Sequence, residues 1–267
     1  MKKALITGAS RGIGRAIAED LGKDHHIYAG ASKDASDIVS ALPSAEPFEA
    51  ELTDTDAILE AASKIEELDV LVLAAGVMDG GPLEELTDDK WREMMEVNLF
   101  APVTLTRALL PALRRSSGLI ITINSGAGFH GIAENSAYCA SKFALRGFTE
   151  SLAQEEAGKV RVTSLHPGRT DTDMLAGSND MPKMAADEVA KAARLAVDAG
   201  PDAVADQDAY DYDDHEFGDG EYGDPQYADG GVDSEYGDEF AAEDQQFDGP
   251  HLGGAGHRPG RKQHPGR

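Results

Sequence analysis

A tyrosine and a lysine four residues apart carry the chemistry that the sequence suggests most directly. In Tyr138-Cys139-Ala140-Ser141-Lys142, helical spacing would place Tyr138 and Lys142 on one face, with their Cβ atoms roughly 6 Å apart. A neighbouring ammonium group favours the phenolate, so we expect the pKa of Tyr138 to fall from its ordinary value of about 10 toward neutrality. Tyr138 would then exchange a proton with a substrate at cellular pH.

A serine upstream is the second candidate for this chemistry. Ser125 lies thirteen residues before Tyr138, at the end of an apolar run at 119–123 and separated from it by one residue; the run predicts a buried parallel strand followed by a glycine-rich loop. Its hydroxyl would be able to donate to the same substrate oxygen. Tyrosine and lysine at this spacing more often form an ordinary solvated helix face, so the interpretation depends on the motifs around them.

A glycine-rich loop near the N-terminus supplies the second motif. Thr7-Gly8-Ala9-Ser10-Arg11-Gly12-Ile13-Gly14 follows a strand expected at 3–7 and precedes a helix expected at 13–21. In this order, glycines let the backbone approach a pyrophosphate, and the helix N-terminus faces its charge. A glycine turn without a ligand is the alternative. Together, the patterns T-G-x-x-x-G-x-G and S…Y-x-x-x-K resemble the short-chain dehydrogenase/reductase family.

The resemblance covers residues 3–200 and implies a fold and a reaction. The fold would be an α/β, three-layer Rossmann-type doubly wound parallel sheet, and the activity hydride transfer between a nicotinamide cofactor and a small carbonyl or alcohol. Ser125 would polarise the substrate oxygen, Tyr138 would protonate it, and Lys142 would hold the nicotinamide ribose. Asn98 would bond a main-chain carbonyl and hold a water that links Lys142 to solvent; a buried asparagine bonded to backbone is the alternative.

The family pattern also implies a set of cofactor-binding residues at the ends of the expected strands. They are Gly8, Ser10, Arg11, Gly12, Ile13, Gly14, Ser32, Glu51, Leu52, Ala74, Ala75, Gly76, Tyr138, Lys142, Pro167, Gly168, Thr170 and Thr172. Two positions depart from the family pattern. Glu51 stands where the family has aspartate, and Leu73 replaces an asparagine that stabilises the central sheet.

The end of the second expected strand, at 26–29, indicates which dinucleotide would bind. An acidic residue at this point binds the adenosine ribose of NAD, whereas basic groups suit the 2′-phosphate of NADP. Neither Ala31 nor Ser32 is acidic, and Arg11 and Lys33 are basic. We therefore expect NADP(H) rather than NAD(H), although Lys33 is equally consistent with an ordinary exposed lysine.

Further elements follow from apolar runs and capping residues. We expect strands at 48–52, 69–74 and 160–166, a helix through Ile65 capped by Thr53 or Asp54, a long helix after Thr87 that contains Asn98, and a helix at 185–197. The methionines Met174, Met181 and Met184 would line an apolar pocket or simply fill space.

The composition changes near residue 200. From Asp202 onward the chain carries 18 acidic and 4 basic residues, a large part of the formal net charge of −25. Leucine and isoleucine nearly vanish there, so we expect residues 201–267 to form an acidic, Gly/Tyr/Asp-rich disordered tail and the family's seventh strand to be missing. The acidity argues against nucleic acid as a partner.

The remaining features of the sequence concern the cellular location of the protein, metal binding and its partners. Cys139 is the single cysteine, no signal segment or membrane span is recognisable, and no metal-ligand spacing occurs, so we expect a cytoplasmic, metal-free protein. The resemblance implies a homodimer or homotetramer. Two alternatives remain open: a catalytically weak dinucleotide-binding module whose acidic tail recruits a basic partner, and an enzyme whose tail serves only solubility.

Overall fold

The structure, a computed structural model of the chain, describes residues 1–31, 34–175 and 182–200. Several sequence predictions concern other parts of the chain and lie outside these residues. They are the roles of Ser32, Lys33 and Met181, the disorder of the tail at 201–267, and the absence of a seventh strand.

Within the described residues, six strands form one parallel sheet in the order β3-β2-β1-β4-β5-β6. Its strands are β1 (Lys2–Ile6), β2 (His25–Ala31), β3 (Ala45–Glu49), β4 (Val70–Leu73), β5 (Leu119–Ile123) and β6 (Arg161–Leu165). The order reverses between β1 and β4, which is the doubly wound arrangement that the sequence predicted.

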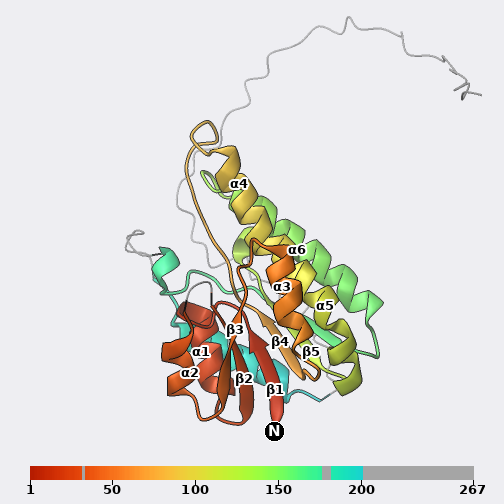
Figure 1. Cartoon of the computed structure of the whole chain (residues 1–267). Helices are drawn as coiled ribbons and strands as arrows, with labels where there is room; N and C mark the ends of the chain where they lie inside the picture. The colour runs from red at the N-terminus through yellow and green to blue at the C-terminus, as the bar shows by residue number, and fades with distance from the viewer. Residues whose placement is uncertain (32–33, 176–181, 201–267) are drawn as a thin grey trace, which may run out of the picture. The chain divides into compact units, whose positions relative to one another are not determined.

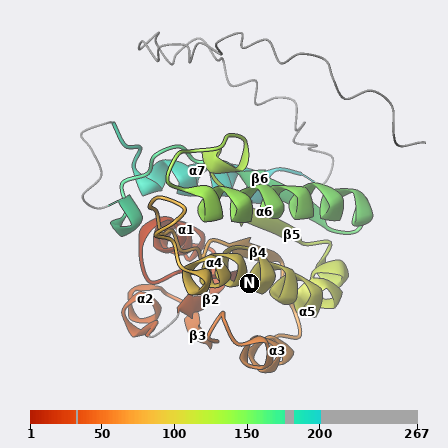
Figure 2. The same cartoon turned by 90° about the horizontal axis from the view of Figure 1, so that it is seen from above.

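Helices cover both faces of this sheet and complete three layers (Figures 1 and 2). They are α1 (Gly12–Leu21), α2 (Ser36–Ala41), α3 (Thr55–Ser63), α4 (Asp88–Met95), α5 (Ala101–Ser116), α6 (Ser136–Glu155) and α7 (Ala186–Asp198). Successive strand residues point to opposite faces. Ile6 therefore packs with residues of α1, α2 and α7, whereas Leu5 packs with residues of α3, α5 and α6.

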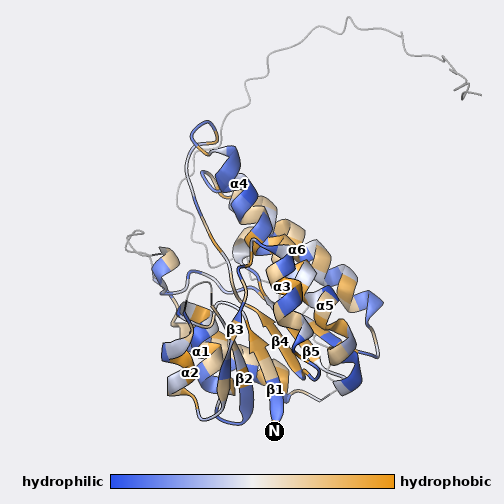
Figure 3. Cartoon of the chain, viewed as in Figure 1, coloured by the Kyte–Doolittle hydropathy of each residue, from blue (hydrophilic) through white to orange (hydrophobic). Residues whose placement is uncertain are grey.

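The central strands are apolar because both of their faces are covered. Every residue of β4 and β5 is buried, and both strands are coloured hydrophobic in Figure 3. The acidic N-terminal end of α4, by contrast, is hydrophilic in the same view. No helix among the described residues combines the length and the apolar character needed to cross a bilayer.

The third strand begins and ends earlier than predicted. It occupies Ala45–Glu49 rather than 48–52, so Glu51 and Leu52 lie in the loop after it. The predicted bounds were wrong because β3 is an edge strand whose extent is set by its pairing with Ile27–Ala31 of β2, and this pairing runs through Pro47. A proline is tolerated there because its missing N–H costs no ladder bond when it faces outward. Asp54 caps α3, as predicted, and accepts from the Asp56 and Ala57 amides at 2.9 and 3.1 Å.

The long helix predicted around Asn98 is interrupted. A π-helical turn at Glu96–Phe100 separates α4 from α5. Pro102 follows in the first turn of α5 and has no N–H to offer the carbonyl four residues earlier, that of Asn98. The Asn98 side chain is at the same time bonded to a distant loop, so the local widening of the helix coincides with a tertiary contact.

Candidate functional site

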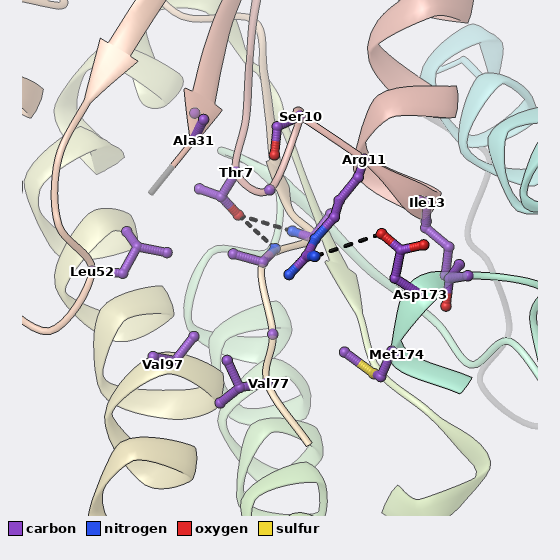
Figure 4. Close-up of a pocket in the computed structure, with 18 of the residues that line it drawn as sticks. Thr7, Ser10, Arg11, Ile13, Ala31, Leu52, Val77, Val97, Asp173 and Met174 are labelled. Atoms are coloured by element: carbon purple, nitrogen blue, oxygen red, sulfur yellow. Dashed lines mark hydrogen bonds and ion pairs between the residues drawn. The ribbon is translucent and has the colours of Figure 1, made fainter. Parts of the chain in front are cut away.

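A cavity of about 530 Å³ opens where the strand order reverses, at the carboxyl ends of β1, β2 and β4 (Figure 4). Ligands of open α/β sheets bind at this edge. Many of the predicted cofactor residues line it. They are Gly8, Ser10, Arg11, Gly12, Ile13, Gly14, Glu51, Leu52, Ala74, Ala75, Gly76 and Thr172.

Thr7 joins the two strands that form the floor of this cavity. Its buried hydroxyl oxygen accepts hydrogen bonds from the amides of Ala74 and Ala75, both at 3.0 Å (Figure 4). The glycine loop after β1 is thereby fixed against the loop after β4. In the sequence, Thr7 was part of the motif but was not among the predicted contacts.

Two glycines in the loop have no room for a side chain. A Cβ on Gly14 would lie 2.3 Å from the Gly8 carbonyl oxygen, so the start of α1 packs directly on the loop. Gly8 has a φ of +68°, and a Cβ there would lie 3.0 Å from Ala75 Cα. The tight packing leaves the N-terminus of α1 beside open space, as a bound pyrophosphate requires.

The N-terminus of α1 suits an anion. Arg11 caps this helix without a side-chain hydrogen bond, its first turn has no acidic residue, and Gly12, Ile13 and Gly14 all face the cavity. Uncapped N–H groups and the helix dipole favour phosphate at such a position. The Arg11 guanidinium pairs with Asp173 at 3.5 Å across the mouth of the cavity (Figure 4). Both side chains are about three-quarters exposed, so the pair is weak and Arg11 is free to turn to a phosphate.

Other lining residues were not predicted from the sequence. They are Thr7, Gly30, Ala31, Phe48, Ala50, Thr53, Val77, Met78, Glu93, Val97 and Asp173; Met174, for which an apolar pocket or space filling was expected, lines the cavity as well. Several adjoin predicted residues, and the rule that ligands bind after strand ends would have found them. Glu93 and Val97 carry no such signal, because they reach the cavity only through the packing of α4 and the π-helical turn.

The proposed proton donor and its lysine lie in the first two turns of α6. Tyr138 and Lys142 are both buried, and the lysine Nζ lies 5.7 Å from the centroid of the tyrosine ring. That nitrogen donates to the carbonyl oxygen of Ile123, the last residue of β5, at 3.0 Å. Helical spacing thus brings the two side chains together, as the sequence predicted.

The expected acidification of Tyr138 is wrong for this structure. Burial raises the pKa of Tyr138 above its ordinary value of 10, and the nearby Ser125 side chain opposes the rise only in part. Burial also lowers the pKa of Lys142 to about 8. Desolvation outweighs the lysine charge because the ammonium is directed to the Ile123 carbonyl and not to the phenol oxygen.

Ser125 completes the cluster from the loop after β5. Its Oγ accepts from the Ala127 amide at 3.1 Å, and its hydroxyl is near enough to the Tyr138 phenol to lower the pKa of that group in part. The cluster adjoins the cavity through Gly76, which lines it. A Cβ on Gly76 would lie 3.8 Å from Lys142 Nζ and 3.2 Å from Asn98 Oδ1. One glycine therefore separates the cavity from two of the predicted catalytic side chains.

Asn98 is buried and all of its side-chain bonding is internal. Its Oδ1 accepts from the Val77 amide at 2.8 Å, and its Nδ2 donates to the Val77 carbonyl at 2.9 Å. The same Nδ2 lies 2.9 Å from Ser141 Oγ, in the helix that carries Tyr138. The predicted bond to a main-chain carbonyl is present, and it ties the loop after β4 to the π-helical turn. The predicted water-holding role stays a prediction.

The segment after β6 only partly reaches the cavity. Thr172 lines it, whereas Pro167, Gly168 and Thr170 are not among the described residues that do. The Thr170 hydroxyl donates to the Gly168 carbonyl at 3.1 Å, and its backbone pairs with Met184. Contacts of these three residues with a cofactor stay predictions.

Comparison with known proteins finds relatives among the short-chain dehydrogenases and reductases. Residues 2–183 match the profile of the family described as short chain dehydrogenase. The 3-oxoacyl-[acyl-carrier-protein] reductase of Salmonella typhimurium is 36% identical over 191 residues, which are 67% of this chain and 78% of that protein. The 3-ketodihydrosphingosine reductase of Bacteroides thetaiotaomicron is 34% identical over 174 residues, 63% of this chain and 64% of that protein.

Solved structures agree with the fold. An alcohol dehydrogenase from the archaeon Thermococcus sibiricus, complexed with 5-hydroxy-NADP, superposes with a TM-score of 0.69 at 29% identity, covering 76% of this chain and 92% of that one. A short chain dehydrogenase from Burkholderia cenocepacia in complex with NADP gives a TM-score of 0.68 at 32% identity, covering 75% and 87%.

Proposed function

Because the chain belongs to the short-chain dehydrogenase family, an oxidoreductase family acting on CH–OH and C=O groups, we propose that it transfers a hydride between NADP(H) and a small carbonyl or alcohol substrate. One observation carries the proposal. The Tyr138 phenol lies in range of the Ser125 hydroxyl and beside Lys142, whose Nζ is one glycine away from the cavity at the glycine-rich loop. A proton donor, an oxygen-binding hydroxyl and a dinucleotide-sized cavity would thus serve one reaction.

Each side chain has a separate task in the proposed reduction. The nicotinamide ring would supply the hydride to the carbonyl carbon. Ser125 would donate to the carbonyl oxygen and hold it beside Tyr138, which would give up its phenolic proton as charge develops there. The raised pKa suits this direction, because it keeps Tyr138 protonated at neutral pH. Lys142 would hold the ribose and, with Asn98, restore the proton.

The choice of NADP(H) is supported by the charges at the cavity. Ala31, at the end of β2, lines the cavity, so this position has no carboxylate to bind ribose hydroxyls or to repel a 2′-phosphate. Arg11 lies at the mouth of the cavity. An NAD site carries an acidic residue at the end of this strand, whereas a 2′-phosphate needs a basic partner. The solved relatives complexed with NADP or 5-hydroxy-NADP favour the same choice.

The decisive experiment follows NADPH oxidation against a diverse panel of aldehydes and ketones. With a substrate in hand, Tyr138→Phe should lower turnover by at least about 100-fold because the proton donor is lost. NADPH binding, measured by fluorescence titration, should change little. Tyr28→Phe on β2 is the matched control and should keep wild-type turnover.

Two outcomes would contradict the proposal. Near wild-type turnover of Tyr138→Phe would show that the site is misassigned. Tight NADPH binding without reduction of any carbonyl in the panel would instead favour a binding module without enzymatic activity.

We also propose that the protein forms a homodimer or homotetramer through its long helices. Phe100 in the π-helical turn is 49% exposed and Phe143 on α6 is 44% exposed. The turn packs against α6, so both rings belong to one helical layer. Burial of such side chains is a frequent reason for association. Analytical ultracentrifugation should find an oligomer that the double substitution Phe100→Glu and Phe143→Glu dissociates, and a wild-type monomer would contradict it.

A further inference from the structure

Ser125 is held on both sides of its main chain by side chains that the proposed mechanism does not use. We propose that Asn124 and His166 form a clamp, called here the serine clamp, that positions the Ser125 hydroxyl for the reaction. The inference rests on the proposed function. The serine belongs to a loop, whereas its hydroxyl must hold a substrate oxygen to within about 0.5 Å, so something outside the loop has to fix it.

Asn124 holds the amide side of the serine. It is buried, its Oδ1 accepts from the Ser125 amide at 2.9 Å, and its Nδ2 donates to the Lys142 carbonyl at 3.3 Å. Its own amide donates to the Leu165 carbonyl at the end of β6 at 2.8 Å. Asn124 therefore connects the backbone of two proposed catalytic residues, one on the loop and one on α6.

His166 holds the carbonyl side. It follows β6 directly, and its Nδ1 lies 3.3 Å from the Ser125 carbonyl oxygen. A carbonyl oxygen can only accept, so this contact requires the proton on Nδ1. Burial lowers the pKa of His166, which keeps the ring neutral and leaves Nε2 without a proton.

The imidazole is itself fixed by packing. The ring centroids of His166 and Phe129 are 4.4 Å apart. The Arg146 guanidinium carbon lies 4.3 Å from the centroid of the same Phe129 ring. Arg146 comes from α6, one turn beyond Lys142. Elements on both sides of the loop, β6 and α6, thus set the position of His166 and through it that of Ser125.

The hydrogen bonds to the Ser125 carbonyl oxygen determine how much turnover should be lost when His166 is replaced. The contact from His166 is long for a hydrogen bond, and the Gly128 amide also donates to the Ser125 carbonyl, at 2.9 Å. Loss of the imidazole therefore loosens the serine without releasing it. The two clamp residues touch neither the cavity nor the reacting atoms, so they are positioning residues.

The test compares two substitutions at one position. Asparagine places an amide donor near the site of imidazole Nδ1, whereas leucine places none. We expect His166→Leu to lower kcat at saturating NADPH and carbonyl by about tenfold, equivalent to about 1.4 kcal/mol, with the Kd of NADPH unchanged. His166→Asn should restore most of the loss. His26→Leu, at the amino end of β2, is the control and should leave kcat unchanged.

A double substitution separates positioning from general damage. If His166 acts through Ser125, then His166→Leu should lower turnover no further in a Ser125→Ala background. Equal kcat in His166→Leu and wild type, or fully additive losses in the double variant, would overturn the proposal. Should His166→Leu fail to fold, His166→Asn and His166→Gln replace it: asparagine should be the more active, and equal activities would overturn the clamp.

A measurement without turnover keeps the clamp distinct from the proposed function. In the ¹⁵N spectrum of histidine-labelled protein, the His166 signal, assigned by its loss in His166→Asn, should show a proton on Nδ1 and none on Nε2 at pH 7.5. The opposite tautomer would overturn the clamp even in an active enzyme. The expected tautomer in a protein that reduces no carbonyl would instead leave the contact intact and refute the proposed function alone.

Discussion

The Lys142 ammonium nitrogen lies 5.7 Å from the centroid of the Tyr138 ring and donates its hydrogen bond to the Ile123 carbonyl, 3.0 Å away. Burial therefore acts on each group separately and favours its neutral form. The pKa of Tyr138 rises and that of Lys142 falls to about 8. The pair therefore consists of a neutral phenol and an amine that loses its proton readily.

The first prediction concerns stability and pH. Lysine in the unfolded chain keeps its proton up to about pH 10.5, whereas Lys142 in the folded protein loses it near pH 8. Between these values the unfolded state binds more protons, so the free energy of unfolding should rise with pH. The shift corresponds to a gain on the order of 3 kcal/mol. Urea unfolding of the cofactor-free protein at pH 7, 8, 9 and 10 measures it.

Lys142→Met is the matched variant, since it keeps the length of the side chain and removes the titrating group. Its free energy of unfolding should lack the rise between pH 8 and 10.5 that wild type shows. Parallel pH curves for the two proteins would contradict a lowered pKa of Lys142.

The second prediction concerns Asn98. Asn98→Ala removes the side-chain bonds to both backbone groups of Val77 and to Ser141, and it leaves buried polar groups without those partners. We expect the free energy of unfolding to fall by about 2–4 kcal/mol. Asn135→Ala is the control: its side chain makes an exposed bond to the Ala133 carbonyl, and its loss should cost below about 1 kcal/mol. A cost for Asn98→Ala no larger than the control would contradict the structural role.

How far the sequence could predict this site is clearest at Tyr138, Lys142 and Ser125. Residues four apart on a helix must meet, and a serine after a central strand must lie at its carboxyl end, so pattern and periodicity were enough to bring them together. The pKa of Tyr138 was predicted in the wrong direction because it depends on burial. Burial is set by the packing of Leu86, Met94 and other distant residues around the ring, which no local pattern reports.

The same limit explains the error around Asn98 and the missed cavity residues. Local periodicity runs continuously from Asp88 to Ser116, and the prolines do not mark the interruption reliably, because Pro102 follows it whereas Pro111 lies inside α5. The π-helical turn accompanies a contact between Asn98 and Val77, 21 residues apart in the chain. The contribution of Glu93 to the cavity likewise depends on how α4 lies, so it became visible only with the tertiary structure.

The third prediction uses two glycines with opposite surroundings. A Cβ at Gly14 would lie 2.3 Å from the Gly8 carbonyl oxygen, so Gly14→Ala must displace the glycine loop from the start of α1. We expect a loss of about 1–3 kcal/mol in stability and at least about tenfold weaker NADPH binding. Gly147→Ala in α6 meets nothing within 4 Å and should stabilise the protein by about 0.5–1 kcal/mol.

Thermal unfolding and fluorescence titration of both variants give the comparison. The Gly147→Ala protein shows whether a methyl group in a helix is harmful in itself. Wild-type NADPH affinity in Gly14→Ala would mean that the loop tolerates displacement and does not bind the cofactor.

The last prediction concerns cofactor choice at the end of β2. Ala31 lines the cavity where an NAD-binding protein has an acidic residue, so Ala31→Asp introduces a carboxylate that binds ribose hydroxyls and repels a 2′-phosphate. We expect the ratio of kcat/KM for NADPH to that for NADH to fall by at least about 30-fold, equivalent to about 2 kcal/mol. Ala31→Asn has nearly the same shape without the charge and should change the ratio far less. If wild type prefers NADH, or if aspartate and asparagine have the same effect, then charge at this position does not select the cofactor.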